Sequence, residues 1–270
     1  MDYINKIICG DSLEKLKEIP EGVITNIITS PPYNLQINYS SYNDDLPYKE
    51  YLNWLKDIFK ECYRVLRTGG RAIINIDAMT NRQEDKQNEY IRPIYADVVN
   101  FMKDIGYKFY GEHIWYKSSK DPSFNGGQFS GRKTSWGSYK SCSFPVVRRN
   151  HEFLIVFSKE QFRLEKTSES LDSDITSEEF QKFIASTWSM HPETRKLGDH
   201  PVPFTEELPY RCIKLYSYPN DIILDPFNGT GTTTYIASVC HRRYIGIDID
   251  QKYCEYAENR IKDSKSIFEN

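Results

Sequence analysis

The chain has 270 residues, of which 39% are hydrophobic and 27% charged, and its net charge is −3. This length favours one large α/β domain over two small ones. No apolar run approaches the roughly 20 residues that span a bilayer, and the N-terminus lacks a signal-peptide pattern, so we expect a cytoplasmic protein without a membrane partner. The six cysteines form no Cys-x-x-Cys pair and no ligand-like pair with any of the five histidines, which argues against a metal site.

Short apolar runs alternate with amphipathic helical patterns along most of the chain. The predicted strands are residues 6–9, 23–28, 71–76, 108–117, 151–159 and two more within 221–250. The predicted helices are residues 12–19 with Ser12 as N-cap, 48–66 ended by Gly69-Gly70, 90–105, one with Thr205 as N-cap, one after Gly231 and one at the C-terminus. This alternation predicts a doubly wound, mostly parallel sheet.

Four features of the sequence directly follow predicted strands. They are Asp11, residues 30–33, the glycine loop at 229–231 and Asp248. In a doubly wound sheet the ligand lies beyond the carboxyl ends of the strands, so we expect these features to converge on one site.

The glycine loop, in LDPFNGTGTT, lies between a predicted strand and a predicted helix. Glycines there allow a tight turn and a close approach to a ligand, but the spacing fits neither a dinucleotide nor a triphosphate motif. Asp248 follows Asp225 by 23 residues and suits the hydroxyls of a ribose, with Asp250 as the alternative. A ribose with a non-phosphate tail describes S-adenosylmethionine. The competing interpretation is a strand–helix turn capped by Asp225.

Ser30-Pro31-Pro32-Tyr33 suits methyl transfer to the exocyclic amine of a base. The amine is a poor nucleophile because its lone pair is delocalised, and acceptors placed on its hydrogens stabilise the positive charge that develops. The Ser30 hydroxyl and the Pro31 carbonyl can be those acceptors, the two prolines hold them in place, and Tyr33 offers a face on which a flipped base can stack. The alternative is a proline-rich turn with Tyr33 in the core.

The sequence resembles the β-class of DNA amino-methyltransferases, which act on cytosine N4 or adenine N6. The segments that carry the resemblance are Gly10-Asp11, Thr29-Ser-Pro-Pro-Tyr33, HEFLIVFSK, HPVPFTEELP, LDPFNGTGTT and YIGIDID. They cover nearly the whole chain in the permuted order of that class, with the catalytic half before the cofactor loop. The resemblance implies a seven-stranded, Rossmann-like methyltransferase sheet with one antiparallel strand, and S-adenosylmethionine as methyl donor.

The resemblance also implies roles for individual residues. The residues expected to line the methionine side of the cofactor are Asp225, Phe227, Gly229, Gly231 and Thr232. Asp248 takes the ribose, Asp11 reaches the adenine, and Pro203 and Phe204 close the pocket. The alternatives are a helix-capping role for Asp11 and ordinary packing at a helix start for Phe204.

A basic stretch from Lys117 to Arg149 contains seven basic residues and one acid. Its basic residues are Lys117, Lys120, Arg132, Lys133, Lys140, Arg148 and Arg149, and the interleaved aromatics are Phe124, Phe129, Trp136, Tyr139 and Phe144. Such a stretch suits phosphates and bases, so we expect it to contact double-stranded DNA, the alternative being a solvated loop. The interval 160–195, where the class usually places target recognition, is short and acidic.

We therefore expect one methyltransferase domain. Its parts are a catalytic half at 1–117 and 150–159, a DNA-contacting insertion at 118–149, a variable segment at 160–195 and a cofactor-binding half at 196–270. Serine before the two prolines is more typical of cytosine-N4 enzymes, with adenine N6 as the alternative. No cysteine follows a proline, which disfavours cytosine C5 methylation.

Two further alternatives are methylation of RNA or protein glutamine, and a silent module that binds S-adenosylmethionine or DNA. The class also allows a restriction endonuclease partner and a homodimer.

Overall fold

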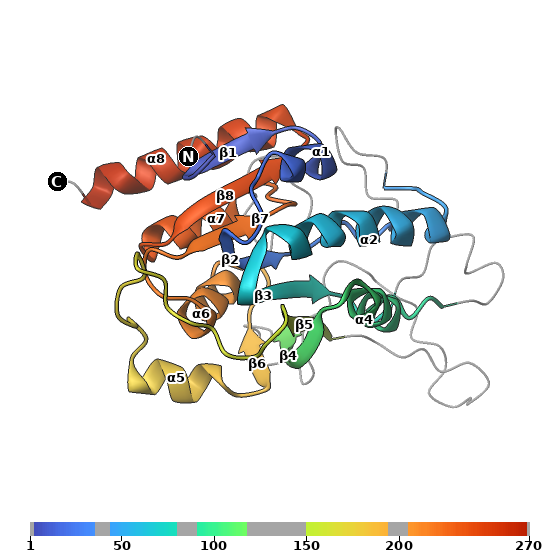
Figure 1. Ribbon diagram of the computed structural model, residues 1–270, viewed down its shortest axis with the longest axis horizontal. Coiled ribbons are helices and arrows are strands. Elements are labelled where there is room, and N and C mark those ends of the chain that lie inside the picture. Colours follow the sequence, from blue (N-terminus) through green and yellow to red (C-terminus); the bar gives the residue numbers. More distant parts are fainter. Residues whose placement is uncertain (1–2, 36–43, 80–90, 118–149, 194–204, 269–270) are drawn as a thin grey trace, which may run out of the picture.

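The computed structural model describes residues 3–35, 44–79, 91–117, 150–193 and 205–268 (Figure 1). Within these residues the centre is one eight-stranded sheet in the order β1-β8-β7-β2-β3-β5-β4-β6. The strands are β1 (Lys6–Cys9), β2 (Ile24–Thr29), β3 (Leu66–Ile76), β4 (Lys108–Lys117), β5 (His151–Ser158), β6 (Thr187–Met190), β7 (Ile222–Asp225) and β8 (Arg243–Asp248). The helices are α1 (Ser12–Lys17), α2 (Tyr48–Val65), α4 (Ile94–Ile105), α5 (Ser177–Phe183), α6 (Glu207–Tyr216), α7 (Thr232–Val239) and α8 (Gln251–Phe268).

The doubly wound, mostly parallel sheet and its single antiparallel strand are confirmed. That strand is β5, which pairs antiparallel with both β3 and β4. The expected number of strands is wrong, because the described residues form eight rather than seven. The additional strand is β6, which pairs parallel with β4 at the edge of the sheet. Its four residues, TWSM, alternate between exposed and buried positions and form no apolar run in the sequence.

Helices cover both faces of the sheet (Figure 1). One core cluster joins β2 and β3 to α1, α2 and α4, and a second joins the other face to α6, α7 and α8. Helix α2 buries Tyr51, Leu55, Ile58, Phe59 and Cys62, which recur three or four residues apart along one face. Burial of this stripe explains why the helical pattern of the sequence appears as a helix here.

Several predicted element ends are wrong, each for a local reason. Asp11, not Ser12, caps α1: its Oδ1 accepts a hydrogen bond from the Glu14 N–H (3.1 Å), while the Ser12 hydroxyl donates to the Pro226 carbonyl. Glu206, not Thr205, occupies the N-cap position of α6. Helix α4 begins after Pro93, because proline has no N–H to donate to the preceding helical turn and is therefore tolerated only at a helix start.

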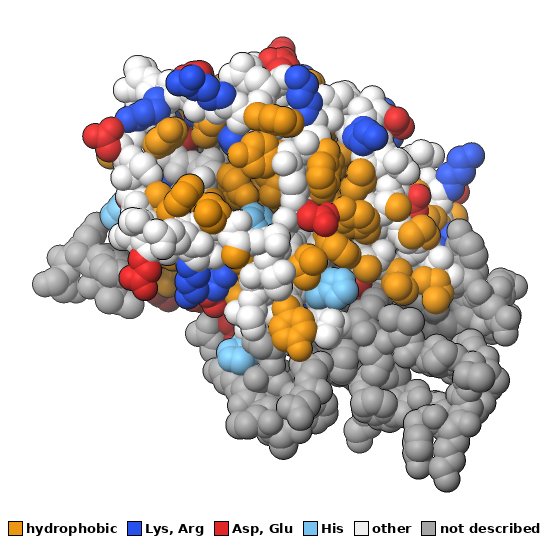
Figure 2. Space-filling view, turned by 90° about the horizontal axis from the view of Figure 1, so that it is seen from below, with side chains coloured by type: hydrophobic (Ala, Val, Ile, Leu, Met, Phe, Trp, Pro, Cys, Tyr) orange, Lys and Arg blue, Asp and Glu red, His pale blue; other side chains and the backbone are white. Residues whose placement is uncertain are grey.

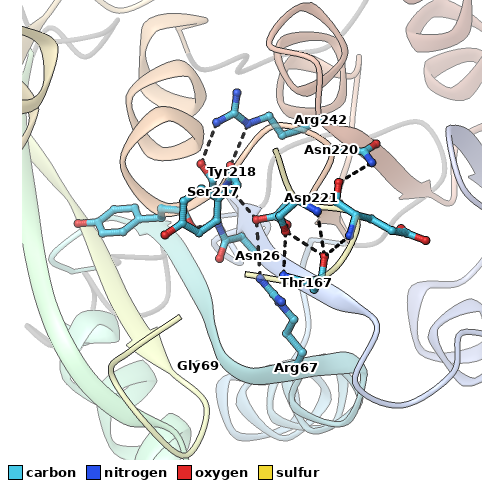
Figure 3. Close-up of polar contacts among 12 residues, drawn as sticks. Asn26, Arg67, Gly69, Thr167, Ser217, Tyr218, Asn220, Asp221 and Arg242 are labelled. Atoms are coloured by element: carbon cyan, nitrogen blue, oxygen red, sulfur yellow. Dashed lines mark hydrogen bonds and ion pairs between the residues drawn. The ribbon is translucent and has the colours of Figure 1, made fainter. Parts of the chain in front are cut away.

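Gly69 and Gly70 lie inside β3 rather than at a helix end. Gly69 has φ of +75°, and a Cβ there would lie 2.1 Å from the Arg163 carbonyl oxygen. The chain after β5 therefore packs directly on the amino edge of the sheet. Ser170 donates to Asp221, in the turn before β7, at 2.7 Å. Figure 3 shows Asp221 near Thr167 of the same segment.

The same segment is also held by a buried cation, Arg242, which directly precedes β8. Both terminal nitrogens of Arg242 donate to the Asp174 carboxylate, at 2.6 and 2.8 Å. Figure 3 shows Arg242 also bonding Ser217. These contacts, with the nearby Lys214, hold the pKa of the Asp174 carboxyl at about 2 although burial acts to raise it. The first part of the acidic interval 160–195 thus lies at the edge opposite to residues 30–33.

Apolar side chains are exposed on the face seen from the side of β4, β6 and α5 (Figure 2). Those with large exposure there are Phe109 and Tyr110 of β4, Phe180 of α5, and Ile184 directly after α5. In the described part of the chain, no helix is both long and apolar enough to cross a membrane. The described residues also include no group of three or more His, Cys, Asp or Glu side chains placed to hold a metal ion.

Candidate active site

The carboxyl edge of four adjacent strands brings the predicted features together. Strands β1, β8, β7 and β2 are neighbours and parallel, so Asp11, Asp248, Asp225 and Ser30 all follow strand ends on the same edge. The Gly10 N–H donates to the Asp248 carbonyl at 2.8 Å. The predicted convergence is therefore confirmed.

Ser30-Pro31-Pro32-Tyr33 forms a rigid turn directly after β2. The Tyr33 hydroxyl lies 3.1 Å from Ser30 Oγ, so the first and last residues of the motif are joined. The Tyr51 hydroxyl of α2 donates to the Pro32 carbonyl at 2.8 Å, whereas the Pro31 carbonyl accepts no hydrogen bond from the described residues. Of the two atoms predicted as amine acceptors, the Pro31 carbonyl thus has no partner among the described residues, and Ser30 Oγ contacts Tyr33.

Asn34 fixes the end of this turn, a role that the sequence analysis missed. It is buried with φ of +54°, a conformation that asparagine tolerates better than most residues. Its side chain exchanges two hydrogen bonds with the backbone of Leu46, and its N–H donates to Asp44 Oδ1 at 2.9 Å. These bonds hold the chain on both sides of residues 36–43.

Asn75 and Glu152, two polar residues missed by the sequence analysis, lie beside the motif. The Asn75 side-chain amide donates to the Tyr33 hydroxyl at 3.0 Å and to Glu152 Oε2 at 2.8 Å. The other oxygen of Glu152 pairs with Lys117. The signal for them was a polar residue next to an apolar run, Asn75 after Ala72–Ile74 and Glu152 before Phe153–Phe157, but their meeting depends on strand order.

Asp225 is buried at the end of β7 and organises the glycine loop. Its Oδ1 accepts hydrogen bonds from the Thr29 hydroxyl at 2.6 Å and from the Phe227 N–H at 3.0 Å. Burial raises the pKa of the Asp225 carboxyl to about 6, although these hydrogen bonds lower it. The contact predicted between Asp225 and the cofactor stays a prediction.

Asp248 and Asp250 have different partners. Asp250 is buried, and its Oδ1 accepts from the N–H groups of Lys252 and Tyr253, so it caps α8. Asp248 is only half-buried, and its two oxygens accept from the N–H groups of Gly229 (2.7 Å) and Asp250 (2.9 Å). Burial raises the pKa of the Asp248 carboxyl, while these two N–H groups lower it. Of the two acids, Asp248 is the one whose carboxylate faces outward.

The other predicted cofactor residues surround the same loop. Phe227 is half-buried against Trp54 of α2, with ring centroids 5.6 Å apart. Gly231 has φ of +79°, and a Cβ there would lie 2.6 Å from the Ala257 Cβ, so close packing of α8 also requires this glycine. Thr232 accepts a hydrogen bond from Arg260 at 3.2 Å. Pro203 and Phe204 lie outside the described residues.

The DNA-binding prediction rests mostly on residues outside the described ranges. These are Lys120, Arg132, Lys133, Trp136, Lys140, Arg148 and Arg149. Lys117 is described, and its side chain pairs with Glu152. The Lys117 N–H donates to the Asn150 carbonyl at 2.9 Å, so the two ends that flank 118–149 meet at the carboxyl edge.

The donors and acceptors at this edge fit S-adenosylmethionine. Backbone N–H groups, among them those of Gly229 and Asp250, fix the Asp248 carboxylate, and a carboxylate has about four lone-pair positions, so it can also accept the hydroxyls of a ribose. Phe227 and Trp54 supply an apolar surface beside the loop. The loop has no lysine and no arginine between Asp225 and Val239, as expected for a ligand without phosphates.

Comparison with known proteins agrees with this geometry. A family model described as DNA methylase, for N6 and N4 methyltransferases, matches residues 24–259. The type II methyltransferase M.MjaVI of Methanocaldococcus jannaschii is 36% identical over 179 residues, which are 66% of this chain and 82% of that protein. The DNA adenine methyltransferase YhdJ of Escherichia coli is 26% identical over 272 residues, covering 94% of this chain and 82% of YhdJ.

Two solved structures share the fold. TTHA0409 of Thermus thermophilus, described as a DNA modification methylase, aligns with a TM-score of 0.74 and 24% identity over 96% of this chain and 95% of its own. The cytosine-N4-specific PvuII DNA methyltransferase aligns with a TM-score of 0.68 and 20% identity over 94% of this chain and 85% of its own. Because the family model spans most of the sequence, this chain belongs to the DNA methylase family and is an S-adenosylmethionine-dependent DNA amino-methyltransferase.

Proposed function

We propose that this enzyme methylates the N4 amine of cytosine in double-stranded DNA, with Ser30 and the Pro31 carbonyl as the groups that hold the amine. The observation that carries the proposal is the turn after β2, in which Tyr33 and Tyr51 anchor the residues on both sides of these acceptors. When bound, S-adenosylmethionine supplies an electrophilic methyl group, which the amine nitrogen attacks with its lone pair.

Ser30 and Pro31 act on the amine hydrogens. Two acceptors on these hydrogens draw the nitrogen towards a pyramidal shape and stabilise the positive charge that grows on it during transfer. Because the turn is already rigid, no reorganisation is needed at the moment of reaction. The methylated amine is acidic enough to lose its proton to water, so the site needs no strong base.

The target base has to leave the duplex, since an exocyclic amine inside a base pair cannot reach acceptors at the end of a strand. Tyr33 is the proposed stacking surface. Its hydroxyl is anchored to Ser30 and Asn75, which fixes the plane of its ring beside the two acceptors. On the cofactor side, Asp248 and the Gly229 loop hold the ribose and the methionine, and Asp11 lies next to Asp248 through the Gly10 hydrogen bond.

The DNA backbone is held by the basic stretch 118–149 in this proposal. Two observations support it: Lys117 and Asn150 place the ends of the stretch at the carboxyl edge, while contacts of Ser170 and Asp174 hold the first part of the acidic interval at the amino edge. Names of relatives as type II methyltransferases also support a restriction endonuclease partner. A homodimer is compatible with the class.

The choice of cytosine rests on the serine at position 30, and the PvuII enzyme supports it. Adenine N6 is the second candidate, because the relative YhdJ is an adenine methyltransferase that matches 94% of this chain. Mass spectrometry of nucleosides, after incubation of the protein with unmethylated DNA and S-adenosylmethionine, separates the two. N4-methylcytosine is the expected product. N6-methyladenine as the product would show that the target base is adenine while the chemistry stays the same. The absence of any methylated nucleoside would contradict the proposed function.

A further inference from the structure

A row of polar side chains crosses the carboxyl edge of the sheet, next to the Ser30–Tyr33 turn. Asn75 of β3, Glu152 of β5 and Lys117 of β4 come from adjacent strands. Side chains alternate along a strand, so they share a face with Ile73, Leu154 and Trp115, two residues away. All three of these apolar residues belong to the core cluster under α6 and α7. The polar row therefore borders a buried core.

Asn75 and Glu152 are buried, and all three members of this row are paired. Asn75 is 3% and Glu152 8% exposed, and Lys117 holds one oxygen of the Glu152 carboxylate. Asn75 Nδ2 donates to the other oxygen at 2.8 Å. A buried ion pair contributes little more stability than apolar residues of the same volume would, so stability alone does not explain why charges occupy this position.

The row continues into the proposed amine-acceptor site. Asn75 Nδ2 also lies 3.0 Å from the Tyr33 hydroxyl and 3.4 Å from Ser30 Oγ. The Tyr33 hydroxyl reaches the Asn75 backbone carbonyl at 3.2 Å and Glu152 Oε2 at 3.5 Å. Both are acceptors, so the Tyr33 hydrogen is directed to them and its oxygen is left to accept from Ser30 at 3.1 Å. With Ser30 as the donor in that contact, its oxygen keeps a lone pair with which to accept a hydrogen from a ligand.

We propose that Glu152 is a positioning residue for methyl transfer, and that the role of Lys117 is to hold Glu152. This inference rests on the proposed function of Ser30. The Glu152 carboxylate fixes the Asn75 amide, which with Tyr33 sets the direction of the Ser30 hydroxyl, so that Ser30 accepts a hydrogen from the amine. Its negative charge also lies near the nitrogen on which positive charge develops. Lys117 then contributes to the rate of transfer rather than to the affinity for DNA phosphates.

The test is the single-turnover rate of tritiated methyl transfer to unmethylated DNA, at saturating DNA and S-adenosylmethionine. Glu152→Gln keeps the shape and an oxygen towards Asn75 but removes the charge, and we expect the rate to fall roughly 10- to 100-fold. The DNA KM and the cofactor Kd are expected to stay within about threefold of wild type, because neither ligand is held by Glu152. An unchanged rate in Glu152→Gln would overturn the proposal.

Lys117→Gln separates the two roles of the lysine. We expect a slower transfer with an unchanged DNA KM, whereas a higher KM at an unchanged rate would make Lys117 a phosphate contact and overturn its assignment. The double variant Glu152→Gln, Lys117→Gln replaces the ion pair with a neutral pair that can still hydrogen-bond, so it is expected to fold like wild type. Its rate is expected to be no lower than that of Glu152→Gln alone, since the two residues act as one unit.

A control outside the site is Asp174→Asn, which breaks the ion pair with Arg242 at the amino edge. It is expected to lower the unfolding temperature and to leave the transfer rate unchanged. If the double variant transfers methyl groups at the wild-type rate, the proposal is overturned even where Glu152→Gln alone unfolds. Failure of the proposed function looks different, since the wild-type protein itself would then methylate no DNA.

Discussion

The Thr29 hydroxyl donates a 2.6 Å hydrogen bond to Oδ1 of Asp225, which lies 196 residues later in the chain. Thr29 is the last residue of β2 and directly precedes Ser30, and Asp225 is the last residue of β7 and directly precedes the glycine loop. Both side chains are buried. One hydrogen bond therefore links the proposed catalytic turn, residues 30–33, to the glycine loop.

Thr29→Val removes this hydrogen bond with little change in shape. The Asp225 carboxylate would lose a partner inside the protein, so we expect the free energy of unfolding to fall by about 1–3 kcal/mol. Urea denaturation at pH 7.5 measures the change. Thr29→Ser keeps the hydroxyl and is the matched control, expected to lose less. Equal stability of the valine variant and wild type would show that the bond contributes nothing.

Asp225 makes stability depend on pH in a predictable direction. Its pKa in the folded protein is raised to about 6, above the value of about 3.8 in the unfolded chain, so folding favours the protonated form. The associated stability is present below pH 4 and is lost as pH rises through about 6. In Asp225→Asn this loss is absent, so the variant gains roughly 3 kcal/mol relative to wild type between acid and neutral pH.

Unfolding of wild type and Asp225→Asn in urea, at a series of pH values from 4 to 7.5, checks this sign. The difference between the two proteins is the quantity to compare, because the other titrating groups cancel in it. A difference that does not change with pH would contradict the raised pKa of Asp225.

Asp248→Asn and Asp250→Asn separate cofactor binding from helix capping. Asp248 carries the proposed ribose contact, so we expect its variant to bind S-adenosylmethionine roughly 10- to 100-fold more weakly, as measured by calorimetry. Asp250 caps α8, and its variant is expected to lose about 1 kcal/mol of stability while keeping cofactor affinity. The reverse pattern would assign the ribose to Asp250.

Charge reversal in the basic stretch tests the DNA-binding proposal. Arg132→Glu with Lys133→Glu is expected to weaken DNA binding and to make the plot of log K against log salt shallower by about 2, one for each lost phosphate contact. Lys166→Glu is the control. Lys166 is exposed and pairs with Asp172, in the segment that lies along the amino edge. If Lys166→Glu weakened DNA binding and the Arg132→Glu, Lys133→Glu variant did not, the DNA would lie on the amino edge instead.

The fold could be predicted because the strands of its centre are apolar runs separated by helical patterns. All six residues of β2 are buried, and α2 repeats its apolar positions at helical spacing. Strand β6 could not be predicted, because only two of its four residues are buried. It forms a strand because it pairs with β4. Short edge strands depend on a neighbour that the local sequence does not reveal.

The candidate site also has residues that could be predicted from the sequence and residues that could not. Residues 30–33 and the glycine loop could be predicted, since proline and glycine restrict the backbone locally. Asn75 and Glu152 could not be predicted, because each is a polar residue next to an apolar run, and only the β3–β5 register brings them together. The choice of Asp248 over Asp250 likewise required the partners of each carboxylate.

The measurement that tests the account most directly is methyl transfer by the double variant Ser30→Ala, Tyr33→Ala, with cofactor affinity measured on the same sample. The account predicts a loss of transfer to unmethylated DNA of roughly a thousandfold or more, because the amine acceptor and the stacking ring are both removed. It also predicts a Kd for S-adenosylmethionine within about threefold of wild type, since neither residue is among those proposed to bind the cofactor. Transfer at the wild-type rate would show that the turn after β2 is not the catalytic site.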